Sequence, residues 1–241
     1  MRSTIDILGV KIDKITAAYA LKKAEQMVRK PGVSTIFTPN PEIVMAAYED
    51  PSFKEVLNSA DMCTPDGIGV VYAAKMLGTP VPERVAGFDL TCGLLESLRK
   101  TGEGVFLFGA KPGVAEAARD KLVEQYTGLN IAGVQHGYFS ESENEDIIKK
   151  INDSGAALLL VCLGAPKQEK WIYENKSKLT SVNLCMGVGG ALDVFAGIVN
   201  RAPDIFIKCN LEWLYRFCKN PSRLNRFATL PRFMMTVRKN K

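Results

Sequence analysis

The chain has 241 residues, of which 46% are hydrophobic and 24% are charged. This length and composition suit one large domain, or a domain with an appendage, and they exclude a chain that is disordered by composition. No apolar run reaches the roughly 18 residues that a membrane-spanning helix requires. Because the N-terminus also lacks the apolar core of a signal peptide, we expect a cytoplasmic protein.

Six cysteines and a single histidine, His136, limit the metal and redox chemistry of the chain. No two cysteines form a Cys-x-x-Cys pair, and Cys162 and Cys185 lie in apolar runs of the kind that bury reduced thiols. A metal site built on imidazoles is therefore disfavoured, and a Ser-His-Asp triad would have to use His136. We expect no zinc site and no disulfide framework.

The net charge of +5 is unevenly distributed along the chain. Residues 201–241 contain ten Lys and Arg against two acidic residues, a local charge of +8, so residues 1–200 carry −3. We therefore predict a body over residues 1–199 and a basic appendage over residues 200–241. Such asymmetry indicates an anionic partner, either a membrane surface or a nucleic acid.

Helix and strand patterns alternate along the body. In its first half they predict a strand or hairpin over 5–12, a helix over 16–29, a strand over 33–38, a helix over 42–48, a short strand over 60–63 and a helix over 70–77. In its second half they predict strands over 104–108, 130–135, 156–163 and 182–186, separated by helices, one of which begins with a capping box at Ser140 and Glu143. This alternation predicts an α/β fold, with a mainly parallel, Rossmann-like sheet covered by helices on both faces.

Polar, glycine-rich segments follow the predicted strands. They are Thr38-Pro39-Asn40, Asp66-Gly67, Gly109-Ala110-Lys111, His136-Gly137-Tyr138, Gly164 to Gln168 and Gly187 to Asp193. In a parallel sheet these segments converge on one edge, where α/β proteins place their ligands. Asp66 thereby becomes a candidate catalytic acid or base, although an ordinary Asp-Gly turn explains the same residues.

Two glycine-rich loops resemble nucleotide-binding motifs but depart from them. The loop at Gly109 lacks the Gly-Lys-Ser/Thr ending of a P-loop, so it is either a phosphate site built on helix amides or a plain connection. The loop at Gly187 is not a G-x-G-x-x-G fingerprint, because Leu192 stands at its last position. An NAD(P)-dependent oxidoreductase is therefore an alternative with little support.

The basic segment combines apolar and cationic faces. Residues 205–218 predict an amphipathic helix, and Asn220-Pro221 would start a second helix that carries Arg223 and Arg226. One interpretation is a helical pair packed on the body with a solvated basic face. The other is an interfacial element with apolar residues toward lipid and arginines at phosphates. A nucleic acid is the less favoured partner, because no recognised binding motif is present and the body is acidic.

Taken together, the motifs resemble the WecG/TagA/CpsF family of glycosyltransferases. The resemblance covers about Thr35 to Arg226 and departs at Ile205, where the family pattern has tryptophan. The matching segments are Thr38 to Asn40, Asp66 to Gly69, Arg84 to Asp89, Phe108 to Gly113, Gly164 to Glu169, Gly187 to Gly197, Arg201 to Pro203 and Glu212 to Arg216.

This resemblance implies transfer of a sugar from a UDP-sugar to a lipid-linked acceptor on the inner face of the plasma membrane. The branch with this tail adds N-acetylmannosamine to undecaprenyl-diphosphate-linked N-acetylglucosamine, an early step of wall teichoic acid synthesis. Relatives use other donors, among them a uronic acid and glucose. A non-catalytic, membrane-bound nucleotide-sugar sensor is a further alternative, and an apolar patch beneath the tail would suit a homo-oligomer.

The resemblance also suggests roles for individual residues. An inverting transfer needs a base for the acceptor hydroxyl, and Asp66 is the candidate. The leaving UDP needs cations or oriented dipoles, and no D-x-D motif is present to hold a metal, so we expect Arg84 to serve without one. Other candidates are Thr38, Asn40 and Gln168 for the sugar, Gly109, Ala110 and Lys111 for the diphosphate, Tyr138 for uracil, Asp193 for ribose, and Arg216, Arg223 and Arg226 for the acceptor's diphosphate. Simpler interpretations are a helix-start cap for Gln168 and a surface acid for Asp193.

Overall fold

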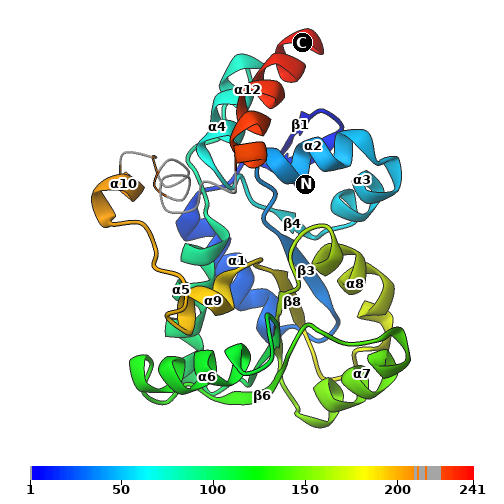
Figure 1. The fold of residues 1–241 in the computed structure, drawn as a ribbon, viewed down its shortest axis with the longest axis vertical. Helices are drawn as coiled ribbons and strands as arrows, with labels where there is room; N and C mark the ends of the chain where they lie inside the picture. Colours follow the sequence, from blue (N-terminus) through cyan, green and yellow to red (C-terminus); the bar gives the residue numbers. More distant parts are fainter. Residues whose placement is uncertain (1, 209–210, 212–214, 216–223) are drawn as a thin grey trace.

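The computed structural model describes residues 2–208, 211, 215 and 224–241 (Figure 1). Its centre is a six-stranded sheet in the order β4-β3-β8-β7-β5-β6, and every neighbouring pair of strands is parallel. The strands are β3 (Ser34–Phe37), β4 (Met62–Cys63), β5 (Val105–Gly109), β6 (Ile131–Gln135), β7 (Leu158–Cys162) and β8 (Leu184–Gly187). This confirms the predicted α/β fold with a parallel sheet.

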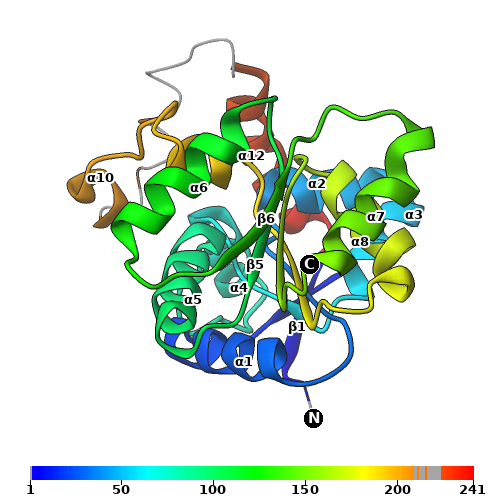
Figure 2. The same ribbon diagram turned by 90° about the horizontal axis from the view of Figure 1, so that it is seen from below.

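Helices cover both faces of the sheet, as predicted (Figure 2). One layer contains α1 (Ala17–Arg29), α5 (Gly87–Thr101), α6 (Val114–Gln125) and α9 (Ala191–Phe195). The other contains α2 (Pro41–Glu49), α3 (Pro51–Asn58), α4 (Ile68–Met76), α7 (Asn144–Asp153) and α8 (Lys167–Asn175). Short 3-10 turns, η1 (Glu141–Glu143) and η2 (Lys176–Lys178), flank α7 and α8, and the N-terminal strands β1 (Thr4–Ile7) and β2 (Val10–Asp13) form a separate antiparallel hairpin.

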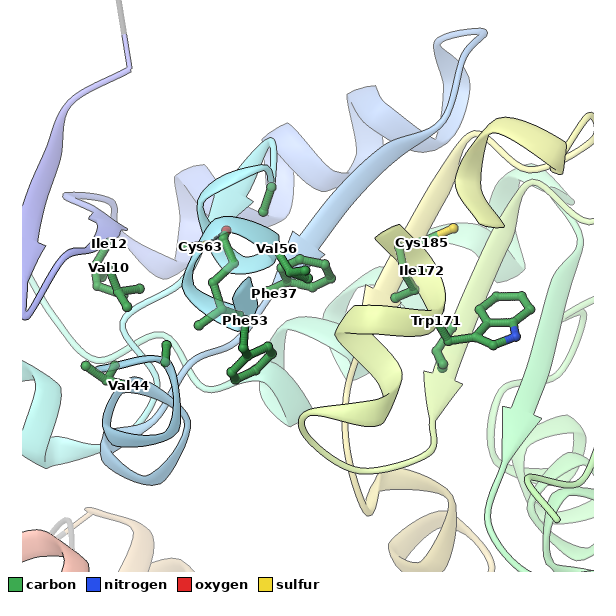
Figure 3. Packing of buried hydrophobic residues seen from close by; sticks show 14 of the residues in the cluster. Val10, Ile12, Phe37, Val44, Phe53, Val56, Cys63, Trp171, Ile172 and Cys185 are labelled. Carbon is green, nitrogen blue, oxygen red and sulfur yellow. Dashed lines mark hydrogen bonds between the residues drawn. The ribbon is translucent and has the colours of Figure 1, made fainter. Parts of the chain in front are cut away.

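The core lies between these layers and the sheet. Figure 3 shows Phe37 and Phe53 close together, and Trp171 and Ile172 projecting from α8. Trp171 meets the ring of Phe108 edge-on, with 4.8 Å between the ring centroids. β5 and β7 are buried along their whole length, which explains why their sequences are continuous apolar runs rather than alternating ones.

Capping side chains set where several helices begin. Thr16 accepts a hydrogen bond from the backbone of Tyr19 at the start of α1, and the predicted capping box of Ser140 and Glu143 is present at η1. Asp50 caps α3, which begins at Pro51. The sequence analysis did not predict α3, because its eight residues give a short pattern directly after α2.

The C-terminal segment differs in part from its predicted form. Helix α10 covers Asp204–Lys208 and Leu211 lies outside any helix, so the prediction of one continuous helix over 205–218 is wrong. Helix α12 (Leu224–Lys239) packs against α2 and α4, and its Phe233 and Val237 belong to the core of the body. The division at residues 199 and 200 stays a prediction.

None of the described helices is both long enough and apolar enough to cross a bilayer.

Candidate active site

The carboxyl ends of β3 and β8 lie side by side in the sheet, and the chain leaves them toward opposite faces. β3 continues into α2 in one helical layer, whereas β8 continues into α9 in the other. Neighbouring loops that part in this way form the topological switch point at which open α/β sheets bind their ligands. The candidate site is therefore expected above these two strands and their neighbours β4 and β7.

Asp66 follows β4 and is tied to the start of α5. Its Oδ2 accepts a hydrogen bond from the backbone N–H of Gly87 at 3.2 Å. The backbone N–H of Val85 donates to the carbonyl of Pro65 at 3.0 Å, so the loop that carries Arg84 is pinned to the loop that carries Asp66. Gly67, with a φ of +82°, permits the turn that separates Asp66 from α4. The two predicted catalytic residues thus lie on loops that are hydrogen-bonded to each other.

Thr38, at the end of β3, bridges from Gly87 to β8. Its hydroxyl donates to the carbonyl of Gly187 at 3.2 Å, and the residue is almost completely buried. A Cβ on Gly87 would lie only 2.7 Å from Thr38 Cγ2 and 2.8 Å from Thr38 Oγ1. A glycine is therefore required for α5 to begin against Thr38, and the same glycine donates to Asp66.

Gln168 connects the loops after β7 and β8. Its Oε1 accepts from the backbone N–H of Gly189 at 2.9 Å, and its Nε2 donates to Glu169 Oε1 at 2.7 Å. The Gly189 partner fixes which end of the Gln168 amide is the oxygen, because a backbone N–H only donates. Gln168 therefore bridges two strand ends, and the simpler interpretation of it as a helix-start cap is not what the structure shows.

Glu169 is a buried acid that sequence reasoning did not single out. It is 1% exposed, and its Oε2 has no hydrogen-bond partner among the described residues. Burial raises the pKa of the Glu169 carboxyl, and the hydrogen bond from Gln168 offsets part of that rise. A buried acid with an unpaired oxygen is costly in a purely structural setting, so its presence beside Gln168 favours a functional site.

Arg84 belongs to a cluster of charged side chains at the start of α5. Its Nη2 lies 3.8 Å from Asp89 Oδ2, and Arg201, which follows α9, pairs with the other oxygen of the same carboxylate. The Arg201 guanidinium lies 4.8 Å from the centroid of the Phe88 ring, and that ring stacks on Phe195. Asp89 and Arg201 both occur in the motif segments quoted above, but nothing in the sequence shows that they meet.

The loop after β5 adjoins the end of β7. Gly109 has a φ of +134°, and a Cβ there would lie 2.3 Å from the carbonyl oxygen of Cys162, so only glycine fits. Ala110 is also left-handed, with a φ of 58°, and its carbonyl accepts from Gly137 at 2.8 Å. Lys111 and Tyr138 are exposed at this end of the sheet. The geometry brings these four candidates together, and their ligand contacts stay predictions.

Asn40 and Asp193 have local structural roles. Asn40 Oδ1 caps α2 by accepting from the backbone of Ile43 at 3.0 Å. Asp193 lies in the first turn of α9, and its backbone carbonyl accepts from Ile198 and Val199. The predicted contacts of their side chains with sugar and ribose stay predictions. Arg216, Arg223 and the side chain of Arg226 lie outside the described residues.

Within residues 2–208, 211, 215 and 224–241, no group of three or more His, Cys, Asp or Glu is placed to hold a metal ion. The expectation of a metal-independent reaction stays a prediction.

Comparison with known proteins agrees with the resemblance inferred from the motifs. The sequence model of the Glycosyl transferase WecG/TagA/CpsF family matches residues 5–241. Two relatives carry the name N-acetylglucosaminyldiphosphoundecaprenol N-acetyl-beta-D-mannosaminyltransferase. The protein from Bacillus spizizenii is 37% identical over 205 residues, which are 85% of this chain and 79% of the relative. The protein from Staphylococcus aureus (strain MW2) is 36% identical over 239 residues, which are 98% of this chain and 93% of the relative. The chain therefore belongs to the WecG/TagA/CpsF family and is a glycosyltransferase.

Proposed function

We propose that the enzyme transfers N-acetylmannosamine from UDP-N-acetylmannosamine to N-acetylglucosamine linked to undecaprenyl diphosphate, with inversion at the anomeric carbon. The names of the relatives support the acceptor and the transferred sugar. The observation that carries the proposal is the position of Asp66, a carboxylate held at the switch-point end of the sheet by Gly87, next to the loop of Arg84.

The acceptor hydroxyl attacks the anomeric carbon from the side opposite to UDP, and Asp66 removes its proton as the new bond forms. A base positioned in this way contributes about 10²- to 10⁴-fold to the rate. The hydrogen bond from Gly87 to Oδ2 restricts rotation of the Asp66 side chain, so the carboxylate is oriented before the acceptor arrives.

Negative charge develops on the UDP oxygen as the glycosidic bond breaks. Arg84 stabilises that charge from the loop joined to Asp66 through Val85 and Pro65. In this proposal the N-acetylmannosamine ring binds beside Thr38 and Gln168, which are held in place by their hydrogen bonds to Gly187 and Gly189. The candidate base, Asp66, and the candidate cation for the leaving group, Arg84, thus lie on loops that are joined by a backbone hydrogen bond.

The experiment that tests this proposal measures UDP release from a panel of donors in the presence of a lipid-diphosphate-linked N-acetylglucosamine. The panel contains UDP-N-acetylmannosamine, its uronic acid and UDP-glucose, and each donor is also measured without acceptor. We expect UDP-N-acetylmannosamine to be the only donor of the panel from which UDP is released, and we expect that release to require the acceptor. Faster release with another donor would overturn the donor assignment, and UDP-sugar binding without release from any donor would favour a sensor.

We also propose that the enzyme attaches peripherally to the inner face of the membrane through its basic C-terminal segment. The charge of +8 over residues 201–241 supports this, because anionic lipids attract such segments. Truncation is a poor test, since Phe233 and Val237 belong to the core. The test is flotation of the full chain with anionic liposomes, comparing the wild type with a variant that combines Arg216→Glu, Arg223→Glu and Arg226→Glu. We expect the variant to lose most binding, and equal flotation would contradict the proposal.

A further inference from the structure

Two arginines that are distant in sequence meet on one carboxylate beside the proposed base. Asp89 lies in the first turn of α5, two residues after the glycine that donates to Asp66. One of its oxygens pairs with Arg201 and the other lies 3.8 Å from Arg84 Nη2. Because a carboxylate neutralises a single positive charge, this group of three side chains has a local charge of +1.

Arg201 is fixed on two sides. Its guanidinium lies 4.8 Å from the centroid of Phe88, and Phe88 stacks on Phe195 with 4.9 Å between centroids. Phe88 and Asp89 are consecutive residues, so the same helical turn supplies the aromatic surface and the carboxylate. An arginine anchored by stacking and by one ion pair keeps further N–H groups for a second anion.

The unpaired Nε–H of Arg201 supports binding of a second anion by this residue. It is buried, and it has no hydrogen-bond acceptor among the described residues. Buried guanidinium N–H groups are normally paired, and an unpaired one marks either strain or a missing partner. Arg201 side-chain exposure is 29%, so the group remains open to a ligand on one side.

We propose that Arg201 is a second cation of the active site and that Asp89 positions it beside Arg84 to receive the diphosphate of the sugar nucleotide. This inference rests on the proposed function, since it names the group that would hold the leaving UDP. Two arginines match the charge of a diphosphate better than one, and the planar forks suit its oxygens. Asp89 reduces the repulsion between the two guanidinium groups before the donor binds.

The test is calorimetric titration of the full-length wild type and variants with UDP and with uridine. We expect Arg201→Ala to weaken UDP binding about 10- to 100-fold, the effect of a lost charged hydrogen-bond group, with uridine binding unchanged. Arg201→Lys keeps the charge and should recover part of the loss. Arg29→Ala is the control, because it removes a guanidinium that pairs with Glu103 at the opposite end of the sheet.

Asp89→Asn tests whether Asp89 positions the two arginines for UDP or only competes with UDP for them. If Asp89 positions the arginines, this variant binds UDP more weakly than the wild type, and the loss is smaller in an Arg201→Ala background. UDP binding that is equal or tighter would mean that Asp89 only competes for the arginines, and it would overturn the positioning role. Wild-type UDP affinity in Arg201→Ala, or an equal loss of uridine, would overturn the role of Arg201.

The two proposals fail in different ways. If the wild type binds UDP through Arg201 but releases no UDP from any sugar nucleotide, the proposed function fails and the diphosphate site stands. If the wild type turns over and Arg201→Ala has the same UDP affinity and turnover, the proposed function stands and the diphosphate site fails.

Discussion

The two ends of the central sheet differ in what their polar side chains contact. At the amino end they hold the connecting loops: Asn183 donates to the carbonyl of Val28 at 2.8 Å, and Asn152 bonds to both Lys178 and Thr180. At the carboxyl end they contact one another and the backbone of glycines, as Gln168 does with Glu169 and Gly189. The hydrogen bonds at the amino end hold the connecting loops in place. Those at the carboxyl end join polar groups of the loops that follow neighbouring strands.

The carboxyl end also contains buried polar atoms whose hydrogen bonds are incomplete. Thr64 Oγ1, which follows β4, and Glu169 Oε2, which follows β7, have no partner in the part of the chain that the structure describes. Such atoms lower stability, so a structure tolerates them where a ligand completes their bonds. The contrast between the two ends is therefore the physical argument for placing the active site above β3 and β8.

Among the substitutions that test the difference between the two ends of the sheet, Gly87→Ala is expected to have the largest effect. The added methyl would lie within 2.9 Å of three side-chain atoms of Thr38, so either Thr38 or the start of α5 must move. We expect turnover to fall at least about 100-fold, because both Thr38 and Asp66 depend on this residue, with about 1–3 kcal/mol lost in stability. Steady-state UDP release and thermal unfolding measure the two quantities.

Gly93→Ala is the matched control in the same helix. Its methyl would meet Leu21 Cδ2 at 3.2 Å, and that side chain is flexible at its end. We expect turnover close to that of the wild type, since α5 gains helix propensity and no site residue moves. Equal turnover in both variants would contradict the role given to Gly87.

A second comparison uses two buried threonines, one within β3 and one directly after it. Thr35 lies at the amino end of β3 and its hydroxyl donates to Asp61 at 3.2 Å, whereas Thr38 lies at the carboxyl end and donates to Gly187 at 3.2 Å. Replacing either with valine removes a hydroxyl at nearly constant shape and should cost about 1–3 kcal/mol. Only Thr38→Val should reduce turnover, by about 10-fold, measured as UDP release at saturating donor. If Thr35→Val reduces turnover as much, the two ends are not functionally distinct.

The smallest expected effect concerns Glu169 and pH. Burial raises the pKa of its carboxyl in the folded protein, so its contribution to stability is complete below the ordinary carboxyl pKa and is lost as pH rises through the raised value. Glu169→Gln stays neutral and keeps an oxygen for the amide of Gln168. We expect its thermal midpoint to gain a few °C on the wild type between pH 4 and pH 7. A difference in midpoint that does not change with pH would contradict a raised pKa.

Much of this contrast follows from the sequence, because strand ends can be located by pattern. The alternation of apolar runs and polar loops placed Thr38, Asp66, Gly109 and Gln168 at strand ends, and a parallel sheet brings such ends to one edge. The order of the strands could not be predicted in the same way. It depends on which crossovers pack, and that is decided by contacts between distant segments.

The pairing of charges was equally out of reach. Asp89 and Arg201 are 112 residues apart, and neither pattern nor spacing links them. Glu169 appears in the sequence as one more polar residue in the first turn of a helix, and its burial depends on how α8 packs against the sheet. Local patterns thus locate the edge that carries the site, whereas the partners within the site require the packed structure.

The most direct test of the central claim is the turnover of Asp66→Asn, measured together with its UDP affinity. Asparagine retains an oxygen that can accept from Gly87, so folding and UDP binding should stay close to wild-type values. Without the carboxylate, acceptor-dependent UDP release should fall about 100- to 10,000-fold. A folded, UDP-binding Asp66→Asn enzyme with near-normal turnover would contradict the assignment of Asp66 as the base.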